Sequence, residues 1–434
     1  MRGLAGWWRQ AMAVGAAVLC TAGTWLYASR VLIPNQVTED EALGRPRGNF
    51  SDLYPRWLGA QELLLRGRNP YGAEVTREIQ AGYYGRPLDR TRASDPQDEQ
   101  GFAYPVYVAF LLAPAVRVPF EIVQRFFFWL LLVVTGASVL IWLRLLRWRL
   151  PWTGRIAAVV LVLGGLPVMQ GLKLEQMSLL VAAMLAIAVL LVREDYPIAA
   201  GIVLALATIK PQLVVLVIVW LGIWTSGDWR RRYRWCASFG VTMAILFAAS
   251  EWWLPHWLGS FWGAVRQYRR YADAVGVLEV LCGPVWGRML EFLAIAAMSE
   301  ICWKWRKEGK ENDLFAGTGA LVLALTALLV PKMALYNDVF LIPAVLLLAR
   351  EWRTIWRENV AGKVLLLVCM GVIVWPWIAA SGLAVFSFVG VGVDARDANA
   401  PFWTAPMIGV GVAAVILVYS LGQTFGRSRE ASTS

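Results

Sequence analysis

The chain has 434 residues, of which 58% are hydrophobic and 16% charged, and its formal net charge is +11. A soluble domain carries roughly 25% charged residues and about 45–50% apolar ones, so this composition excludes an ordinary soluble globular protein. Apolar runs long enough for membrane helices recur between residues 10 and 425. They predict an all-α fold, a polytopic transmembrane bundle of about 11–13 membrane segments that forms a single domain over residues 1–434.

The positive charge does not indicate a nucleic-acid partner, because the basic residues lie in short loops between apolar runs, as membrane topology requires. The cysteines show no metal-ligand spacing and mostly lie in apolar segments, so we expect neither a disulfide framework nor a metal site. The sequence also lacks a glycine-rich phosphate loop and a serine–histidine–acid set. We therefore expect no cofactor.

The first apolar run covers residues 10–33 and follows Arg2 and Arg9. This pattern predicts a retained anchor with a cytoplasmic N-terminus. Residues 34–103 then form a long first periplasmic loop, whose parts 37–48 and 86–100 we expect to be irregular. A second periplasmic loop is predicted at residues 256–277.

The polar stretch 48–71 lies within the first loop and carries one carboxylate, Asp52, among aromatic side chains. Beyond Pro55 the apolar spacing predicts a short amphipathic helix on the membrane surface, which ends at Gly67 and is followed by a turn at Asn69. Asp52 could act as a general base toward a bound hydroxyl. The alternative is that Asp52 caps the N-terminus of the helix, and the two roles are compatible.

Residues 102–119 are too few to span comfortably and predict a re-entrant half-helix. Further spans are predicted near 120–143, 156–169, 176–192, 198–209, 212–225, 235–254, 290–305, 315–330, 339–349, 364–383 and 404–425. If 102–119 does not cross and both helices beside Lys210-Pro211 do, every basic loop falls on the cytoplasmic side. In the rival count, residues 102–119 cross the membrane and the two helices beside Lys210-Pro211 act as one span. That count leaves the Arg144 loop outside.

Under this topology Lys173, Lys210 and Lys332 lie at span ends on the outer side, and Arg266 lies in the next outer loop. Cations on that side run against the usual loop bias, and an anion such as a lipid phosphate would explain them. The alternative is that each lysine extends to the interface independently.

Carboxylates and amides occur at the same edge, in the pairs Glu175-Gln176 and Asn337-Asp338. They are candidates for substrate binding, although pairing with a neighbouring lysine is an equal alternative. His256, the only histidine, follows two tryptophans and either acts as a base or packs at the interface.

Several elements together resemble glycosyltransferase family 87 over about residues 48–350. They are Ser-Asp-Leu-Tyr at 51–54, Arg-Gly-Arg-Asn-Pro-Tyr at 66–71, Phe-Ala-Tyr-Pro at 102–105, Leu-Glu-Gln-Met-Ser-Leu-Leu at 174–180 and Ile-Lys-Pro at 209–211. The chain departs from the family pattern at Glu175, where glycine is usual, at Val106, where a second proline is common, and at Asn337, where many members carry histidine.

The resemblance implies a GT-C fold and a bacterial inner-membrane enzyme whose active site faces the periplasm. Such enzymes move a sugar from a polyprenyl-phosphate donor to a lipid- or glycan-linked acceptor hydroxyl, with inversion and without a metal. By position the catalytic aspartate is Asp52. We expect the donor phosphate at Lys210, Lys173, Lys332 and Arg266. Substrate contacts are expected from Tyr54, Arg56, Asn69, Tyr71, Tyr104, Glu175, Gln176, His256, Asn337 and Asp338.

Two other functions fit part of the pattern. A transporter or flippase of lipid-linked saccharides would use the same basic outer surface, but it should carry polar sites near mid-membrane and often internal repeats, which the sequence lacks. A non-catalytic partner in envelope assembly fits if Asp52 is only a helix cap. The membrane is the expected environment in every case.

Overall fold

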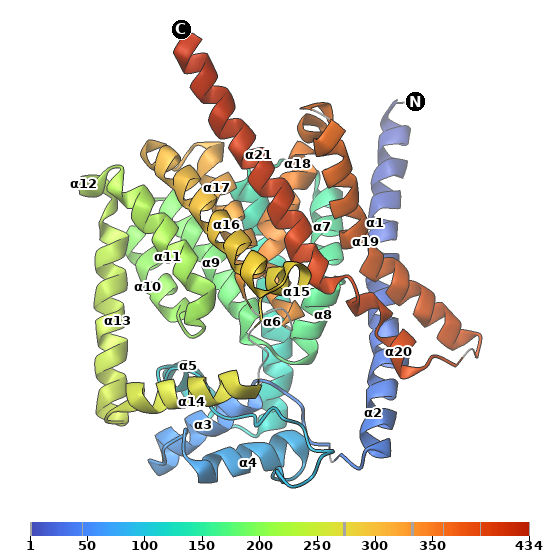
Figure 1. Cartoon of the computed structure of the whole chain (residues 1–434), viewed down its shortest axis with the longest axis vertical. Helices are drawn as coiled ribbons and strands as arrows, with labels where there is room; N and C mark the ends of the chain where they lie inside the picture. Colours follow the sequence, from blue (N-terminus) through green and yellow to red (C-terminus); the bar gives the residue numbers. More distant parts are fainter. Residues whose placement is uncertain are drawn as a thin grey trace.

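The structure is a computed structural model that describes residues 2–45, 47–271, 275–330, 334–358, 360–390 and 392–433. These residues form helices and loops, and no β-strand occurs among them. Most helices run along the long axis of the molecule, while α4 and α14 lie across one end (Figure 1). The predicted polytopic helical bundle is confirmed.

The N-terminal helix is longer than predicted. α1 (Arg2–Tyr27) continues through a π-helical turn (Ala28–Leu32) into α2 (Ile33–Ala42), so the expected loop from residue 37 is wrong as far as Ala42. Proline inside a helix clashes with the carbonyl four residues earlier. The wide π turn lies where Pro34 would clash, and the helix can therefore continue.

The amphipathic helix is confirmed as α3 (Tyr54–Arg66), with Trp57 and Leu63 buried and Gly67 ending it at φ 64°. Only glycine adopts that left-handed conformation without strain. A second helix, α4 (Ala73–Tyr84), follows and was not predicted. Arg68 joins the two helices, because its guanidinium pairs with buried Glu62 at 2.7 Å and with Glu78 on α4 at 2.8 Å. Residues 86–100 are irregular, as expected.

Residues 102–119 contain only a short buried helix, α5 (Val108–Leu112), and one 3₁₀ turn, η2 (Ala113–Ala115). The other elements, in chain order, are α6 (Phe120–Leu145), α7 (Trp152–Leu163), α8 (Leu166–Lys173), α9 (Met177–Arg193), α10 (Pro197–Ala207), α11 (Pro211–Ser226), α12 (Trp229–Arg232), α13 (Arg234–Trp253), α14 (Trp257–Tyr271), α15 (Val277–Cys282), α16 (Pro284–Lys304), η3 (Trp305–Lys307), α17 (Asp313–Leu329), η4 (Leu335–Leu341), α18 (Ile342–Glu358), α19 (Val360–Phe388), α20 (Ala395–Ala398), η5 (Ala400–Phe402) and α21 (Ala405–Thr433). The second predicted periplasmic loop, 256–277, therefore holds the amphipathic helix α14.

Within the described ranges, five helical segments are long and apolar enough to cross a membrane: Gln10–Ala42, Phe120–Leu145, Arg234–Trp253, Val360–Phe388 and Ala400–Thr424. The pair α7 and α8, bent by 58°, adds a sixth candidate. The shorter apolar helices α9, α10, α11 and α17 have 10–17 residues each. They pack inside the bundle, where Leu185, Leu204, Leu221 and Leu321 are fully buried. The total of 11–13 membrane segments stays a prediction.

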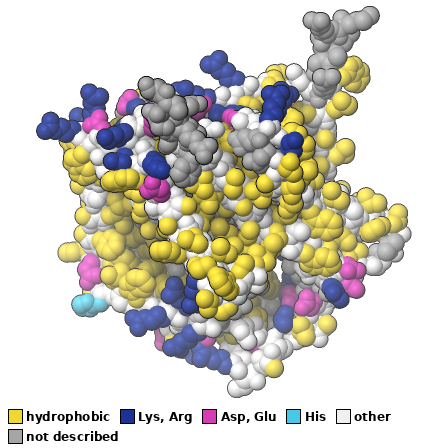
Figure 2. Space-filling view, turned by 45° about the horizontal axis from the view of Figure 1, so that its top comes forward, with side chains coloured by type: hydrophobic (Ala, Val, Ile, Leu, Met, Phe, Trp, Pro, Cys, Tyr) yellow, Lys and Arg dark blue, Asp and Glu magenta, His cyan; other side chains and the backbone are white. Residues whose placement is uncertain are grey.

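The basic loops meet at one end of the bundle, which we call the basic face (residues 144–155, 193–196, 228–234, 304–313 and 350). Ion pairs connect them, for example Arg147 with Glu311 at 3.4 Å and Arg350 with Asp313 at 3.5 Å. Figure 2 shows Lys and Arg side chains along the upper rim and again at the lower end, with a hydrophobic band between. α10 and α11 are separate helices of 11 and 16 residues that meet at Lys210, and the preferred topology, in which both cross the membrane, stays a prediction.

Candidate active site

The segment before α3 is fixed by backbone hydrogen bonds at the end opposite the basic face. The N–H groups of Asn49 and Phe50 donate to the carbonyls of Gly82 and Tyr83 at the end of α4, at 3.1 and 3.3 Å. The N–H of Asp52 donates to the carbonyl of residue 174, in the loop between α8 and α9, at 2.9 Å. Asp52 is thus held between two elements that are far apart in the sequence.

The Asp52 carboxylate points into a polar cluster and does not cap the helix. The Gln176 side-chain amide donates to Asp52 Oδ2, and the Tyr83 hydroxyl donates to Oδ1 at 3.3 Å. Leu53 is the N-cap residue of α3, and no side chain caps this end. The capping alternative is therefore wrong, and Asp52 remains a candidate for chemistry.

Gln176 connects this carboxylate to a buried cation. Its amide oxygen accepts a hydrogen bond from Lys210 Nζ at 2.6 Å, while its amide nitrogen faces Asp52. Lys210 lies at the break between α10 and α11, is only 7% exposed, and also donates to Ser178 Oγ at 2.8 Å. Ser178 in turn donates to Asn337 Oδ1 at 2.7 Å. A continuous polar chain therefore runs from Asp52 to η4.

A second cation, Arg56, lies beside the first. Its guanidinium carbon is 4.2 Å from the centre of the Tyr104 ring, and the side chain donates to the Asp52 carbonyl. Lys210 Nζ lies 5.8 Å from the same ring and 5.2 Å from the ring of Tyr336. The Tyr71 hydroxyl donates to the Tyr104 carbonyl at 2.6 Å and so helps to fix that ring.

The two cations of this cluster interact with the Asp52 charge but do not form an ion pair with it. Over the described ranges neither Arg56 nor Lys210 forms a salt bridge, and Arg56 Nε is buried without a hydrogen-bond partner. Burial lowers the pKa of Lys210, and Arg56 lowers it further. Burial raises the pKa of Tyr104, but Arg56 and Lys210 outweigh it and bring this pKa below its ordinary value. The positive potential at Tyr104 favours an anion.

Glu175 adds a titratable group next to Asp52. It is 5% exposed, has φ 48°, and accepts a hydrogen bond from Gln124 at 3.3 Å. Burial raises its pKa to about 7, and the Asp52 charge adds to the shift. A carboxyl with this pKa is largely protonated in mildly acidic solution and can donate a hydrogen bond there.

Three other predicted residues, Lys173, Arg266 and His256, lie outside the cluster. Lys173 donates to Gln36 on α2 at 2.6 Å. Arg266 is exposed on α14, and His256 is exposed at the corner between α13 and α14 (cyan in Figure 2). Lys332 lies outside the described residues.

The remaining predicted residues support the surroundings of the cluster. The side chain of Asn69 accepts from the N–H of Tyr71 at 2.9 Å and so shapes the turn. The ring of Tyr54 packs edge-on against Phe120, with 4.8 Å between centroids. Asp338 lies next to Asn337 on η4 and borders a small cavity against α21.

Sequence reasoning missed Tyr83, Tyr336, Tyr268 and Gln124, which lie on four different helices. Tyr268 on α14 interacts electrostatically with Asp98 and with the Asp52–Arg56–Tyr104 cluster. These residues have no signature at a fixed sequence distance from Asp52. Ser178 was also missed as a site residue, although it lies in the 174–180 element that carries part of the family resemblance.

The fold and the cluster define a polytopic membrane protein with a polar site where the apolar helices end. The sequence matches the model of glycosyltransferase family 87 over residues 102–331, more than half of the chain, and the protein belongs to this family. Comparison with curated proteins gives no match, nor does comparison with solved structures. The matched region includes Tyr104, Gln176 and Lys210 and begins after Asp52. Membership implies a membrane glycosyltransferase.

Proposed function

We propose that the protein moves a sugar from a polyprenyl-phosphate donor to a hydroxyl group of a lipid- or glycan-linked acceptor, with inversion at the anomeric carbon. One observation carries the proposal: Gln176 bonds the Asp52 carboxylate with one end of its amide and the Lys210 ammonium with the other. A general base and a phosphate-binding cation therefore share one site. The membrane supplies both lipid-linked substrates.

Arg56 and Lys210 hold the donor phosphate in this proposal. Both cations are without a carboxylate partner in the described part of the chain, and Arg56 Nε is an unsatisfied buried donor. Buried donors of this kind require a partner, and phosphate oxygens form strong charge-assisted hydrogen bonds with lysine and arginine. As the sugar leaves, negative charge grows on the phosphate, and the two cations stabilise it.

Asp52 accepts the proton of the acceptor hydroxyl. The hydroxyl oxygen forms a bond to the anomeric carbon while the bond from that carbon to the phosphate oxygen breaks, and its electron pair leaves with the phosphate. A single displacement inverts the configuration at the anomeric carbon. Gln176 and Tyr83 position the Asp52 carboxylate by donating to its two oxygens. Glu175, whose pKa is about 7, is partly protonated at neutral pH and so adds less negative charge beside Asp52 than an ordinary carboxyl would.

The charge distribution supports a location for this reaction. Basic loops favour the cytoplasmic side of a bacterial plasma membrane. With the basic face and the N-terminus on that side, the Asp52 cluster at the other end faces the periplasm, where lipid-linked sugars replace nucleotide donors. The site set is then Asp52, Arg56, Lys210, Gln176 and Tyr104, with the amphipathic helices α3 and α14 alongside.

The test is sugar transfer by the purified full-length protein from a panel of synthetic polyprenyl-phosphate sugars. Asp52→Asn should lower turnover by about 10²–10⁴-fold, the usual contribution of a general base. Asp228→Asn on the basic face is the matched control and should keep wild-type turnover. Wild-type turnover in Asp52→Asn would remove the base assignment. Lipid movement in vesicles without any transfer would favour the flippase alternative.

A further inference from the structure

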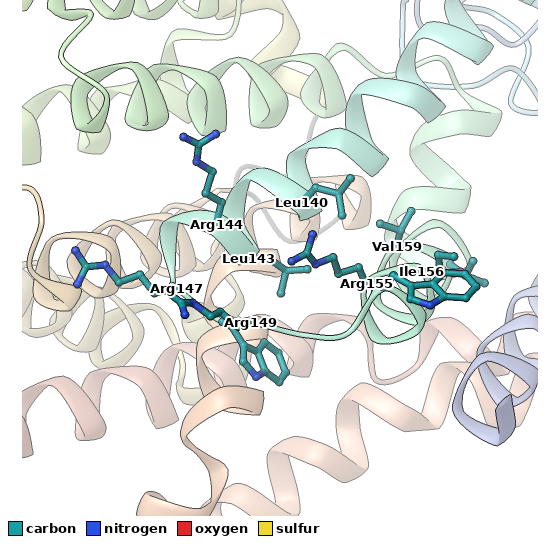
Figure 3. A pocket seen from close by; sticks show the side chains of 11 residues that line it. Leu140, Leu143, Arg144, Arg147, Arg149, Arg155, Ile156 and Val159 are labelled. Atoms are coloured by element: carbon teal, nitrogen blue, oxygen red, sulfur yellow. The ribbon is translucent and has the colours of Figure 1, made fainter. Parts of the chain in front are cut away.

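A second cationic feature lies on the basic face, between the end of α6 and the start of α7. It is a cavity of about 1000 Å³ with an apolar floor and an arginine rim (Figure 3). Its lining residues are Leu140, Leu143, Arg144, Arg147, Trp148, Arg149, Trp152, Arg155, Ile156, Val159 and Val160. In Figure 3 Arg155 extends from α7 toward Leu140 and Leu143, whereas Arg147 points away from the cavity.

This cavity is separate from the Asp52 cluster. The two lie at opposite ends of α6, whose 26 residues correspond to a length of about 39 Å. Phe120, at the first end of α6, packs against Tyr54 and Trp57 beside the cluster, with ring centroids 4.8 and 5.2 Å apart. The cavity therefore cannot hold the phosphate that Arg56 and Lys210 bind.

Only part of the rim charge is neutralised by the protein. Arg144 pairs with Glu194 at 2.8 Å, and Arg147 pairs with Glu311 at 3.4 Å. Arg149 and Arg155 are exposed and have no carboxylate within ion-pair distance among the described residues. Two guanidinium groups at the mouth of an apolar cavity thus remain available to an anion.

The loop that carries the rim is held rigidly. Arg147 adopts φ 52°, the left-handed conformation that usually requires glycine at a helix end, and the N–H of Trp148 bonds back to the Leu143 carbonyl at 3.0 Å. Arg193 and Arg350 donate to the last carbonyls of this turn from two other helices. A preformed site loses less conformational entropy when a ligand binds.

We propose that this cavity binds an anionic phospholipid. Its phosphate contacts Arg149 and Arg155, and an acyl chain lies along Leu140, Ile156 and Val159. Basic residues near a membrane surface contribute about 1 kcal/mol each toward anionic lipids, whereas a zwitterionic headgroup presents its own cation to the rim. Trp152, which is 71% exposed, lies where tryptophans anchor at the interface. The usual excess of basic residues in cytoplasmic loops explains why these arginines are present. It does not explain why they lie over an apolar floor.

Native mass spectrometry of the purified full-length protein tests the proposal, with equal amounts of dioleoyl phosphatidylglycerol and phosphatidylethanolamine. The wild type should retain phosphatidylglycerol preferentially, and Arg149→Gln with Arg155→Gln should weaken that binding by about tenfold or more. Arg230→Gln with Arg234→Gln removes the same charge from the same face outside the cavity and should leave binding unchanged. Equal losses in the two double variants, or equal retention of both lipids, would overturn the proposal.

The apolar floor has its own test. Val159→Trp fills the cavity but keeps every arginine, and it should also weaken phosphatidylglycerol binding. Soluble glycerol 3-phosphate should not compete, because it lacks the acyl chain. A lipid site would be contradicted if glycerol 3-phosphate displaced phosphatidylglycerol at equal concentration and Val159→Trp bound the lipid like the wild type. The readout is lipid retention, so it is independent of whether the protein transfers sugar from polyprenyl phosphate.

Discussion

The two ends of the bundle treat their cations differently. On the basic face, arginines such as Arg147 and Arg350 pair with carboxylates that join neighbouring loops, at 3.4–3.5 Å. At the other end, Arg56 and Lys210 contact aromatic rings, an amide and a hydroxyl, and the described structure gives neither a carboxylate partner within salt-bridge distance. Ion pairs neutralise part of the positive charge on the basic face, where Arg149 and Arg155 stay unpaired in the described structure, whereas both cations beside Asp52 lack a salt bridge.

This difference between paired and unpaired cations predicts different effects on stability and on ligand binding. An exposed ion pair contributes roughly 0–1 kcal/mol, so losing one pair on the basic face should change little. A buried cation without a counter-ion is costly, and the protein retains it where an anion later fills the site. Changes at the Asp52 end should therefore act on substrate binding and turnover, and changes on the basic face should act weakly on stability.

The largest effect is expected from removing both site cations. Lys210→Met with Arg56→Gln should lower donor affinity by about 10²–10⁴-fold, because each charged hydrogen bond contributes roughly 1.5–3 kcal/mol. Binding of a labelled polyprenyl-phosphate sugar to the purified protein measures this. Lys304→Met on the basic face is the control and should bind the donor like the wild type. An unchanged donor affinity in the double variant would remove the phosphate assignment.

Glu175 should make stability depend on pH. The pKa is about 7 in the folded protein against an ordinary value of 4.5, so the folded state holds a proton that the unfolded state releases. Stability from this group is present below the ordinary value and is lost as pH rises through about 7. Glu175→Gln should therefore stabilise the protein above that pH, by an amount on the order of 3 kcal/mol.

Thermal unfolding of Glu175→Gln between pH 5 and 8.5, compared with the wild type, checks this expectation. The difference in melting temperature should grow as the pH rises. Glu41→Gln, an exposed change on α2, is the control and should show no such trend. A difference for Glu175→Gln that stays constant with pH would contradict the raised pKa.

Gly48 is expected to matter because the backbone of α4 approaches it closely. A Cβ atom there would lie 2.2 Å from the carbonyl oxygen of Gly82 and 2.4 Å from that of Tyr83. Gly48→Ala should cost about 1–3 kcal/mol of stability and lower transfer, because it separates Asp52 from Tyr83.

Gly222→Ala on α11 is the matched control, since a Cβ atom there meets nothing within 4 Å. It should be neutral or stabilising by up to about 1 kcal/mol. Unfolding temperature and turnover of both variants measure the contrast. If the two variants behave alike, the close contact of segment 48–52 with α4 does not hold the site.

The smallest effect belongs to the basic face. Glu311→Gln removes the carboxylate that pairs with Arg147 and Arg193, and it should change stability by less than about 1 kcal/mol. Donor affinity and turnover should stay at wild-type values. A large loss of transfer in this variant would show that the two ends of the bundle are coupled, and the comparison between them would fail.

Local sequence patterns predicted the helices whose bounds depend only on neighbouring residues. The apolar spacing after Pro55 predicts α3, Gly67 predicts its end, and the run of apolar segments predicts the bundle. The pattern failed where a distant partner or an unusual turn decides the structure. The helix continues past Pro34 through a π turn, and α4 and α14 carry polar residues that their neighbours accommodate.

In the site too, local sequence patterns predicted some features, whereas contacts between distant residues decided the others. Asp52, Gln176 and Lys210 stand out as polar residues at predicted span ends, but their contacts join positions up to 124 residues apart and follow only from the packing of α3, α9 and α11. Lys173 shares the same pattern, yet its partner is Gln36 on α2. Charge and position alone could not separate these two lysines. The position of Tyr83 beside Asp52 depends on how residues 48–84 fold against each other, so a local sequence pattern could not predict it.

Separate measurement of donor binding and sugar transfer in Asp52→Asn tests the central claim most directly. With labelled donor bound to the purified protein and acceptor then added, the variant should bind donor with wild-type affinity and transfer sugar about 10²–10⁴-fold more slowly. Wild-type transfer, or a loss of donor binding that fully explains the slower transfer, would contradict the role of Asp52 as the base.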